Sequence, residues 1–212
     1  MDLISIVGNI ATVCTVLSGL SGLPICLEYI RKGSTLNSSV LPFLAGMICT
    51  NLWLQYSVIL NDSMLLTVNL ITTLLQTMYV LCYFIITSNK KTTLQMFGIA
   101  IIFLFFTYIY GFHVIGKNAA INTIGFMAAF SSIAASATPL ANVSQILQTK
   151  SSESLPFPII FSTFVVTTLW FIYGMLVEDS FIQIPNIIGA ILSGFQLSLI
   201  VLYPSTKAIK KE

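Results

Sequence analysis

The sequence predicts an all-α integral membrane protein whose seven transmembrane helices form two parallel three-helix-bundle repeats joined by a linker helix, a 3+1+3 arrangement. Three observations lead to this class. Of 212 residues, 56% are hydrophobic and only 8% are charged, whereas soluble domains carry about 25% charged residues. The sixteen charges fall into short groups separated by long uncharged intervals. In addition, a segment of 26 residues recurs 117 positions further along the chain.

Composition excludes several other classes. A mean hydropathy of +0.94 excludes a disordered chain, and a net charge of +2 offers no basic surface, so we expect no nucleic-acid partner. No cluster of a nucleophile with an acid and a base points to an enzyme. We read the four cysteines as small apolar residues and expect neither a metal nor a cofactor. They are Cys14, Cys26, Cys49 and Cys82.

The uncharged intervals count the spans. Each is 24 to 32 residues long, enough for the roughly 20 residues of helix that cross a bilayer. Apolar runs such as 99–106 lack the alternation of a membrane β-strand, which favours helices. The seven intervals are residues 3–27, 33–61, 63–89, 92–116, 118–149, 154–177 and 180–206.

Basic residues predict the orientation. Eight of the nine lie on one set of alternate connections, and only Lys117 lies on the other set. The positive-inside rule then predicts a cytosolic C-terminus and an extracellular or lumenal N-terminus. The start of the chain lacks the basic region of a cleaved signal peptide, so we expect the first span to be retained.

An internal repeat organises the spans. Residues 50–75 share nine identities with residues 167–192, including both tryptophans of the chain. Three spans per copy is an odd number, so one linker span makes the two copies parallel, an arrangement known from SWEET transporters. We therefore predict four parts: a first repeat at 3–87, a linker helix at 92–114, a second repeat at 120–203 and a short cytosolic tail at 204–212.

The repeat places aromatic and amide side chains at one depth. Trp53 and Trp170 each precede an aspartate by nine residues, and Asn69 and Asn186 each follow one by seven. These four side chains should lie about 10–14 Å inside the membrane boundary. An indole packs against the apolar face of a sugar ring, and a carboxamide exchanges hydrogen bonds with hydroxyl groups. The set predicts a sugar-binding pocket; the alternative is that the asparagines only link helices and the tryptophans face lipid.

The interior carries no charge. No Asp, Glu, Lys or Arg lies in the middle of a predicted span, whereas proton-coupled carriers usually need a titratable group there. Passive facilitated diffusion is therefore preferred over proton-coupled transport.

Prolines and tyrosines suggest how the path opens and closes. Two prolines per repeat lie in the predicted cytosolic parts of the spans, where each permits a kink. Together they would form a hinge, although a proline near a span end also marks a simple helix start. They are Pro24, Pro42, Pro139 and Pro156. At the opposite mouth, hydrogen bonds between Tyr56 and Asp179, and between Tyr173 and Asp62, are the weaker inference of a gate.

Five motifs resemble the SWEET sugar transporters, also called the saliva family, over almost the whole chain. They are P-F-L-A-G at 42–46, Trp-x-x-Tyr at 53–56, Q-T-K-S-S-E-S-L-P-F at 148–157, W-F-I-Y-G at 170–174 and D-S-F-I-Q-I-P-N at 179–186. The last is most similar to animal, particularly arthropod, members. The resemblance implies a bidirectional sugar uniporter in the plasma or Golgi membrane, with the same pocket, proline tetrad and gate, and it suggests homo-oligomers. Trp53 is bulkier than its counterpart in many plant members, which predicts glucose-like monosaccharides over sucrose.

Two departures bear on the alternatives. The broader PQ-loop group has Pro-Gln at the first-helix bend, whereas this chain has Pro24-Ile25 and Pro139-Leu140. This counts against an amino-acid transporter of that group, and the tandem repeat counts against a seven-span sorting receptor. The glycine after the second Trp-x-x-Tyr motif, Gly174, is Ser57 in the first repeat, where helix packing should differ.

Overall fold

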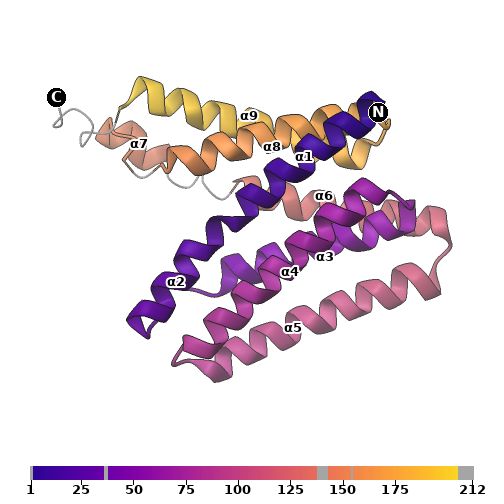
Figure 1. The fold of residues 1–212 in the computed structure, drawn as a ribbon, viewed down its shortest axis with the longest axis horizontal. Helices are drawn as coiled ribbons and strands as arrows, with labels where there is room; N and C mark the ends of the chain where they lie inside the picture. The colour runs from indigo at the N-terminus through magenta and orange to yellow at the C-terminus, as the bar shows by residue number, and fades with distance from the viewer. Residues whose placement is uncertain (1, 36–37, 138–142, 154, 205–212) are drawn as a thin grey trace. The chain divides into compact units, whose positions relative to one another are not determined.

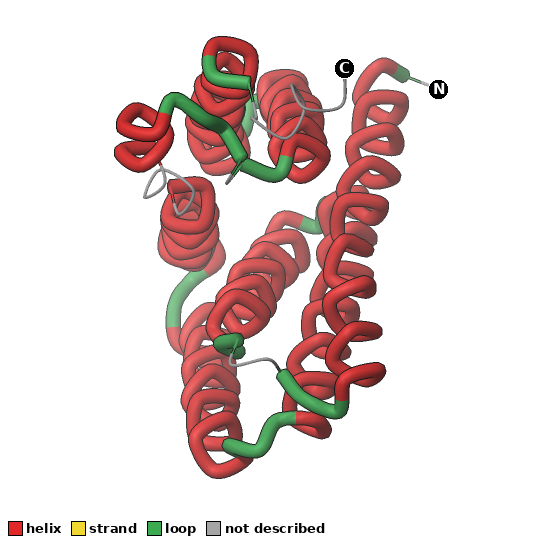
Figure 2. Tube along the Cα trace, turned by 90° about the vertical axis from the view of Figure 1, so that its left-hand side faces the viewer, coloured by secondary structure: helices red, strands yellow, loops and turns green. Residues whose placement is uncertain are grey.

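The computed structural model describes residues 2–35, 38–137, 143–153 and 155–204, and throughout these residues the secondary structure is helical (Figures 1 and 2). The elements are α1 (Leu3–Gly19), the 3₁₀ turn η1 (Leu20–Gly22), α2 (Leu23–Lys32), α3 (Leu41–Leu60), α4 (Ser63–Ile86), α5 (Lys90–Ile109), the π-helical turn η2 (Tyr110–Val114), α6 (Lys117–Ala137), α7 (Val143–Thr149), α8 (Phe157–Leu176) and α9 (Ser180–Leu202).

Seven helical stretches within the described residues are long and apolar enough to cross a membrane. Each overlaps one uncharged interval of the sequence, so the predicted all-helical, seven-span class is confirmed. The first stretch, Leu3–Lys32, runs beyond the predicted interval. It can do so because Glu28 and Lys32 are one helical turn apart and form an ion pair of 2.7 Å on the exposed face of α2.

The chain divides into two compact units, described separately here. One comprises Thr15–Ala128, and the other combines Met1–Cys14 with Ala129–Glu212. These units group residues by contact, whereas the predicted repeats group them by sequence. The repeat boundaries therefore stay a prediction.

Each unit contains one helical hairpin. In the first, α3 and α4 lie side by side (Figure 1), with Leu52, Tyr56 and Val80 buried between the helices. In the second, α8 and α9 form the corresponding pair, and α7 joins them through a core of apolar side chains. That core consists of Ile146, Leu155, Ile160 and Leu199.

The two hairpins turn in the same way. Asn61 and Glu178, 117 positions apart, both adopt the left-handed backbone conformation, with φ of 62° and 56°. The next residue is an aspartate whose carboxylate accepts hydrogen bonds from the first free N–H groups of the following helix. Asp62 accepts from Met64 and Leu65 at 2.9 and 3.0 Å. Asp179 accepts from Phe181 and Ile182 at 2.8 and 3.3 Å.

We expect Asp62→Ala to lower the free energy of unfolding by about 1 kcal/mol, because it leaves those two N–H groups of α4 without their acceptor. Asp62→Asn keeps an acceptor oxygen and should retain most of that stability. Thermal unfolding of the purified variants in detergent measures the difference. An alanine variant as stable as the asparagine variant would contradict the capping role.

Candidate functional site

The register of the α3–α4 hairpin fixes which residues lie at one level. Two packing contacts define it. A Cβ placed on Gly46 would lie 2.8 Å from the side-chain amide of Gln76, and the rings of Phe43 and Tyr79 have centroids 5.6 Å apart. Counted from Asp62, these pairs lie 16 before with 14 after and 19 before with 17 after, a constant offset of two.

The same offset aligns the predicted site residues of this hairpin. Trp53 lies nine residues before Asp62 and Asn69 seven residues after it, so the indole and the amide belong to one level of the helix pair. Both side chains are buried. The indole also packs edge-on against the ring of Tyr56, with centroids 5.6 Å apart and an interplanar angle of 84°.

The α8–α9 hairpin repeats this arrangement. A Cβ placed on Gly189 would lie 2.8 Å from the Thr167 methyl group, a pair 12 before and 10 after Asp179, again offset by two. Trp170 and Asn186 are therefore level as well. Trp170 packs edge-on against Tyr173 at 5.2 Å and 78°. The structure thus brings each tryptophan to the level of its asparagine within each hairpin.

Both asparagines are oriented by a bond to their own helix. Nδ2 of Asn69 donates to the Leu65 carbonyl, and Nδ2 of Asn186 donates to the Ile182 carbonyl, each at 2.8 Å. Among the described residues, neither side-chain oxygen accepts a hydrogen bond. Each amide therefore presents an oriented acceptor in an apolar helix pair, which suits a hydroxyl donor on a neutral ligand.

The predicted hinge prolines occupy different settings. Pro24 follows the 3₁₀ turn that interrupts the first span. Pro42 is the second residue of α3, and Pro156 immediately precedes α8. At a helix start a proline removes no intrahelical hydrogen bond. Pro139 lies outside the described residues, and the hinge stays a prediction.

The predicted gate pairs residues of different units. Tyr56 and Asp62 belong to Thr15–Ala128, whereas Tyr173 and Asp179 belong to the other unit. What the structure describes for the aspartates is their capping of α4 and α9. The gate therefore also stays a prediction.

Comparisons with known proteins identify the family. The family profile described as "Sugar efflux transporter for intercellular exchange" matches residues 2–91 and 122–208. The chain belongs to this family. It is 37% identical to the sugar transporter SWEET1 of Drosophila pseudoobscura pseudoobscura, over 92% of this chain and 87% of that protein. It is 27% identical to the bidirectional sugar transporter SWEET10 of Arabidopsis thaliana, over 95% of this chain and 74% of that protein.

A solved structure of a eukaryotic SWEET transporter has the same fold. The TM-score is 0.85 at 24% identity, covering 95% of this chain and 99% of that one. The chain is therefore a multi-pass membrane protein of a family of sugar transporters, not an enzyme. Its similarity to animal SWEET1 proteins confirms the resemblance drawn from the motifs.

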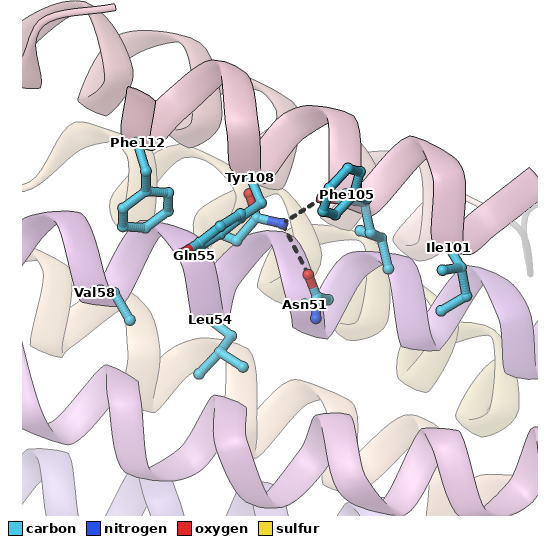
Figure 3. Close-up of a pocket in the computed structure, with 9 residues that line it drawn as sticks. Asn51, Leu54, Gln55, Val58, Ile101, Phe105, Tyr108 and Phe112 are labelled. Atoms are coloured by element: carbon cyan, nitrogen blue, oxygen red, sulfur yellow. Dashed lines mark hydrogen bonds between the residues drawn. The ribbon is translucent and has the colours of Figure 1, made fainter. Parts of the chain in front are cut away.

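Sequence reasoning missed a polar contact between this SWEET's α3 and α5 (Figure 3). Gln55 is 7% exposed, and its Nε2 donates to Asn51 Oδ1 at 2.9 Å, Thr107 Oγ1 at 3.1 Å and the Leu104 carbonyl at 3.2 Å. The amide thus fastens α5 to α3 beside a hollow of about 590 Å³ lined mainly by apolar side chains such as Phe105. Two amides four residues apart in an apolar helix were the available signal.

The hairpin register predicts the effect of filling its closest approach. Gly46→Ala should lower the free energy of unfolding by about 1–3 kcal/mol, because the new methyl group overlaps the Gln76 amide. Adding Gln76→Ala should recover part of that loss. Both effects can be measured by thermal unfolding of the single and double variants.

Gly98→Ala provides the matched control, because a Cβ on this helical glycine of α5 meets nothing within 4 Å. It should leave stability unchanged or raise it by up to about 1 kcal/mol. Additive effects of Gly46→Ala and Gln76→Ala would contradict the contact, and with it the register that levels Trp53 with Asn69.

Proposed function

We propose that this SWEET is a facilitative, bidirectional uniporter of glucose-like monosaccharides that works by alternating access around a central neutral pocket. The observation that carries the proposal is the duplicated pairing of tryptophan and asparagine at one level of each hairpin. Trp53 with Asn69, and Trp170 with Asn186, would supply two aromatic faces and two oriented amide acceptors to one sugar ring.

Charge placement supports passive transport. The uncharged intervals leave no titratable carboxylate or amine at mid-span to couple flux to protons. A neutral pocket binds and releases an uncharged solute without moving net charge across the membrane, so the sugar gradient alone sets the direction of flux. The printed names of the relatives, which include bidirectional sugar transporters, agree with this mechanism.

The other parts of the proposal follow from the sequence. The repeats at 3–87 and 120–203 would move about the proline tetrad, with the linker at 92–114 between them. The tyrosines and aspartates of the predicted gate would close the mouth on the N-terminal side. We also propose a cytosolic C-terminus, residence in the plasma or Golgi membrane, and assembly into homo-oligomers.

The test is flux in proteoliposomes. Radiolabelled glucose should equilibrate across the membrane without a pH or sodium gradient, and imposing either gradient should not change the final distribution. Accumulation above equilibrium would overturn uniport. Binding without flux would favour a receptor, and amino-acid flux without sugar flux would favour the PQ-loop alternative.

Asn69→Ala and Asn186→Ala should each lower glucose flux by at least about tenfold, because each removes an acceptor for a sugar hydroxyl. Flux per reconstituted protein molecule is the measurement. Asn9→Ala is the matched control: Nδ2 of Asn9 makes the same bond to the carbonyl four residues earlier, also at 2.8 Å, but on an exposed face of α1. Wild-type flux in both pocket variants would remove these residues from the site.

Trp53→Ser should change the substrate range. A smaller side chain widens the pocket, so we expect glucose flux to fall and the sucrose-to-glucose flux ratio to rise about tenfold. Competition between the two labelled sugars measures this ratio. Phe105→Ser, at a 64% exposed position of α5, should leave it unchanged. An unchanged ratio in the Trp53 variant would show that this residue does not limit substrate size.

A further inference from the structure

The first span contains a backbone break with a clear chemical cause. Pro24 has no N–H to donate to the carbonyl of Leu20, its partner in a continuous α-helix. Instead, the N–H of Leu23 bonds to that carbonyl, which tightens Leu20–Gly22 into a 3₁₀ turn. In a continuous helix the same Leu23 N–H would bond to the carbonyl of Gly19.

A side chain from α4 compensates at the carbonyl that has lost its α-helical donor. The hydroxyl of Tyr79 donates to the Gly19 carbonyl at 2.9 Å, across 60 residues of sequence. Gly22 makes this approach possible, because a Cβ on it would lie 2.5 Å from the tyrosine ring. Within a membrane span, where water is absent, an added donor to a backbone carbonyl has a large effect.

α4 also holds α2 beyond the break. The thiol of Cys82 donates to the carbonyl of Cys26 at 3.9 Å, and the rings of Tyr83 and Tyr29 pack edge-on with centroids 6.0 Å apart. Tyr79 is therefore the contact of α4 that lies at the break itself.

Two hydrogen-bond arrangements of the break compete. In the 3₁₀ form, Leu23 serves the Leu20 carbonyl and Tyr79 serves the Gly19 carbonyl. In a continuous α-helical form, Leu23 would serve Gly19, the Leu20 carbonyl would face Pro24 without a donor, and the tyrosine hydroxyl would lose its acceptor. Tyr79 thus favours the 3₁₀ form. The second repeat has Gln196 at the corresponding position, 117 residues later, so this contact is particular to the first repeat.

We propose that Tyr79 is a positioning residue that stabilises the 3₁₀ form of the Leu20–Gly22 turn, and that it thereby sets the rate at which the sugar-free carrier changes its orientation. The effect on rate rests on the proposed alternating-access function. The effect on the turn itself does not, and the two can be measured separately.

Tyr79→Phe removes only the hydroxyl and keeps the ring. Loss of one such hydrogen bond should shift the equilibrium between the two forms roughly fivefold. Tyr83→Phe is the matched control, because it removes a tyrosine hydroxyl from the same helix that donates to the Ser38 carbonyl at 2.7 Å, away from the break.

The transport readout is the ratio of equilibrium exchange to net efflux. Exchange bypasses reorientation of the empty carrier and net efflux does not, so this ratio reports that step, whereas simple loss of folded protein lowers both rates equally. We expect a severalfold change in Tyr79→Phe and none in Tyr83→Phe. An unchanged ratio in Tyr79→Phe, or an equal change in both variants, would overturn the effect on rate.

The structural readout needs no transport. Spin labels at Leu17 and Ile30, which are 63% and 61% exposed on either side of the turn, report its conformation as a distance distribution. Tyr79→Phe should add a second component, and Tyr83→Phe should not. A wild-type distribution in Tyr79→Phe would overturn the role of the hydroxyl, whereas wild-type protein that fails to equilibrate glucose would contradict only the proposed function.

Gly22→Ala reaches the same bond from the other partner, because its methyl group would displace the Tyr79 ring from Gly19. It should shift the distance distribution in the same direction as Tyr79→Phe, and combining the two changes should add nothing further. Additive shifts would mean that Gly22 and Tyr79 act independently, which would contradict the proposal.

Discussion

Backbone hydrogen bonding in a medium without water is the constraint on which the rest of this structure depends. Polar side chains are few, and several serve helix ends or breaks. Asp62 and Asp179 accept from the first N–H groups of α4 and α9, and Lys90 donates to the last carbonyls of α4, those of Phe84 and Ile85. Tyr79 does the same at the 3₁₀ turn. Against this background, the side-chain oxygens of Asn69 and Asn186 differ, because neither accepts a bond from the described chain.

The features that could be predicted from sequence are those that act locally or occur twice. Charge spacing located the spans because a charge is costly inside hydrocarbon wherever the neighbouring helices lie. The shift of 117 residues located matching turns, caps and tryptophans because each repeat solves the same local problem with the same residues. The depth estimate placed Trp53 near Asn69 only approximately. Their common level needed the contact of Gly46 with Gln76, which depends on how closely two helix backbones approach.

The features that sequence reasoning missed are single and long-range. Gln55 reaches Leu104 across 49 residues, and Tyr79 reaches Gly19 across 60. Their repeat counterparts, Ile172 and Gln196, are different residues, so comparing the repeats gives them no weight. Prolines show a related limit. Pro24, Pro42 and Pro156 look alike in sequence, yet only Pro24 stands beside an interruption within a span, because the outcome depends on whether helical residues precede the proline.

Duplicated and single features therefore divide the work of the fold. Matching Trp–Asn levels give both hairpins the same chemistry toward a neutral ligand, which a carrier that loads from either side requires. Single contacts such as Gln55 with α5 and Tyr79 with Gly19 occur in one hairpin only, and Pro185 interrupts α9 where α4 has Val68. Two repeats with unequal internal hydrogen bonds cannot change conformation at equal cost. The two orientations of such a carrier should consequently differ in free energy while the ligand chemistry stays symmetric, so the direction of net flux still follows the sugar gradient and the asymmetry changes only the rates.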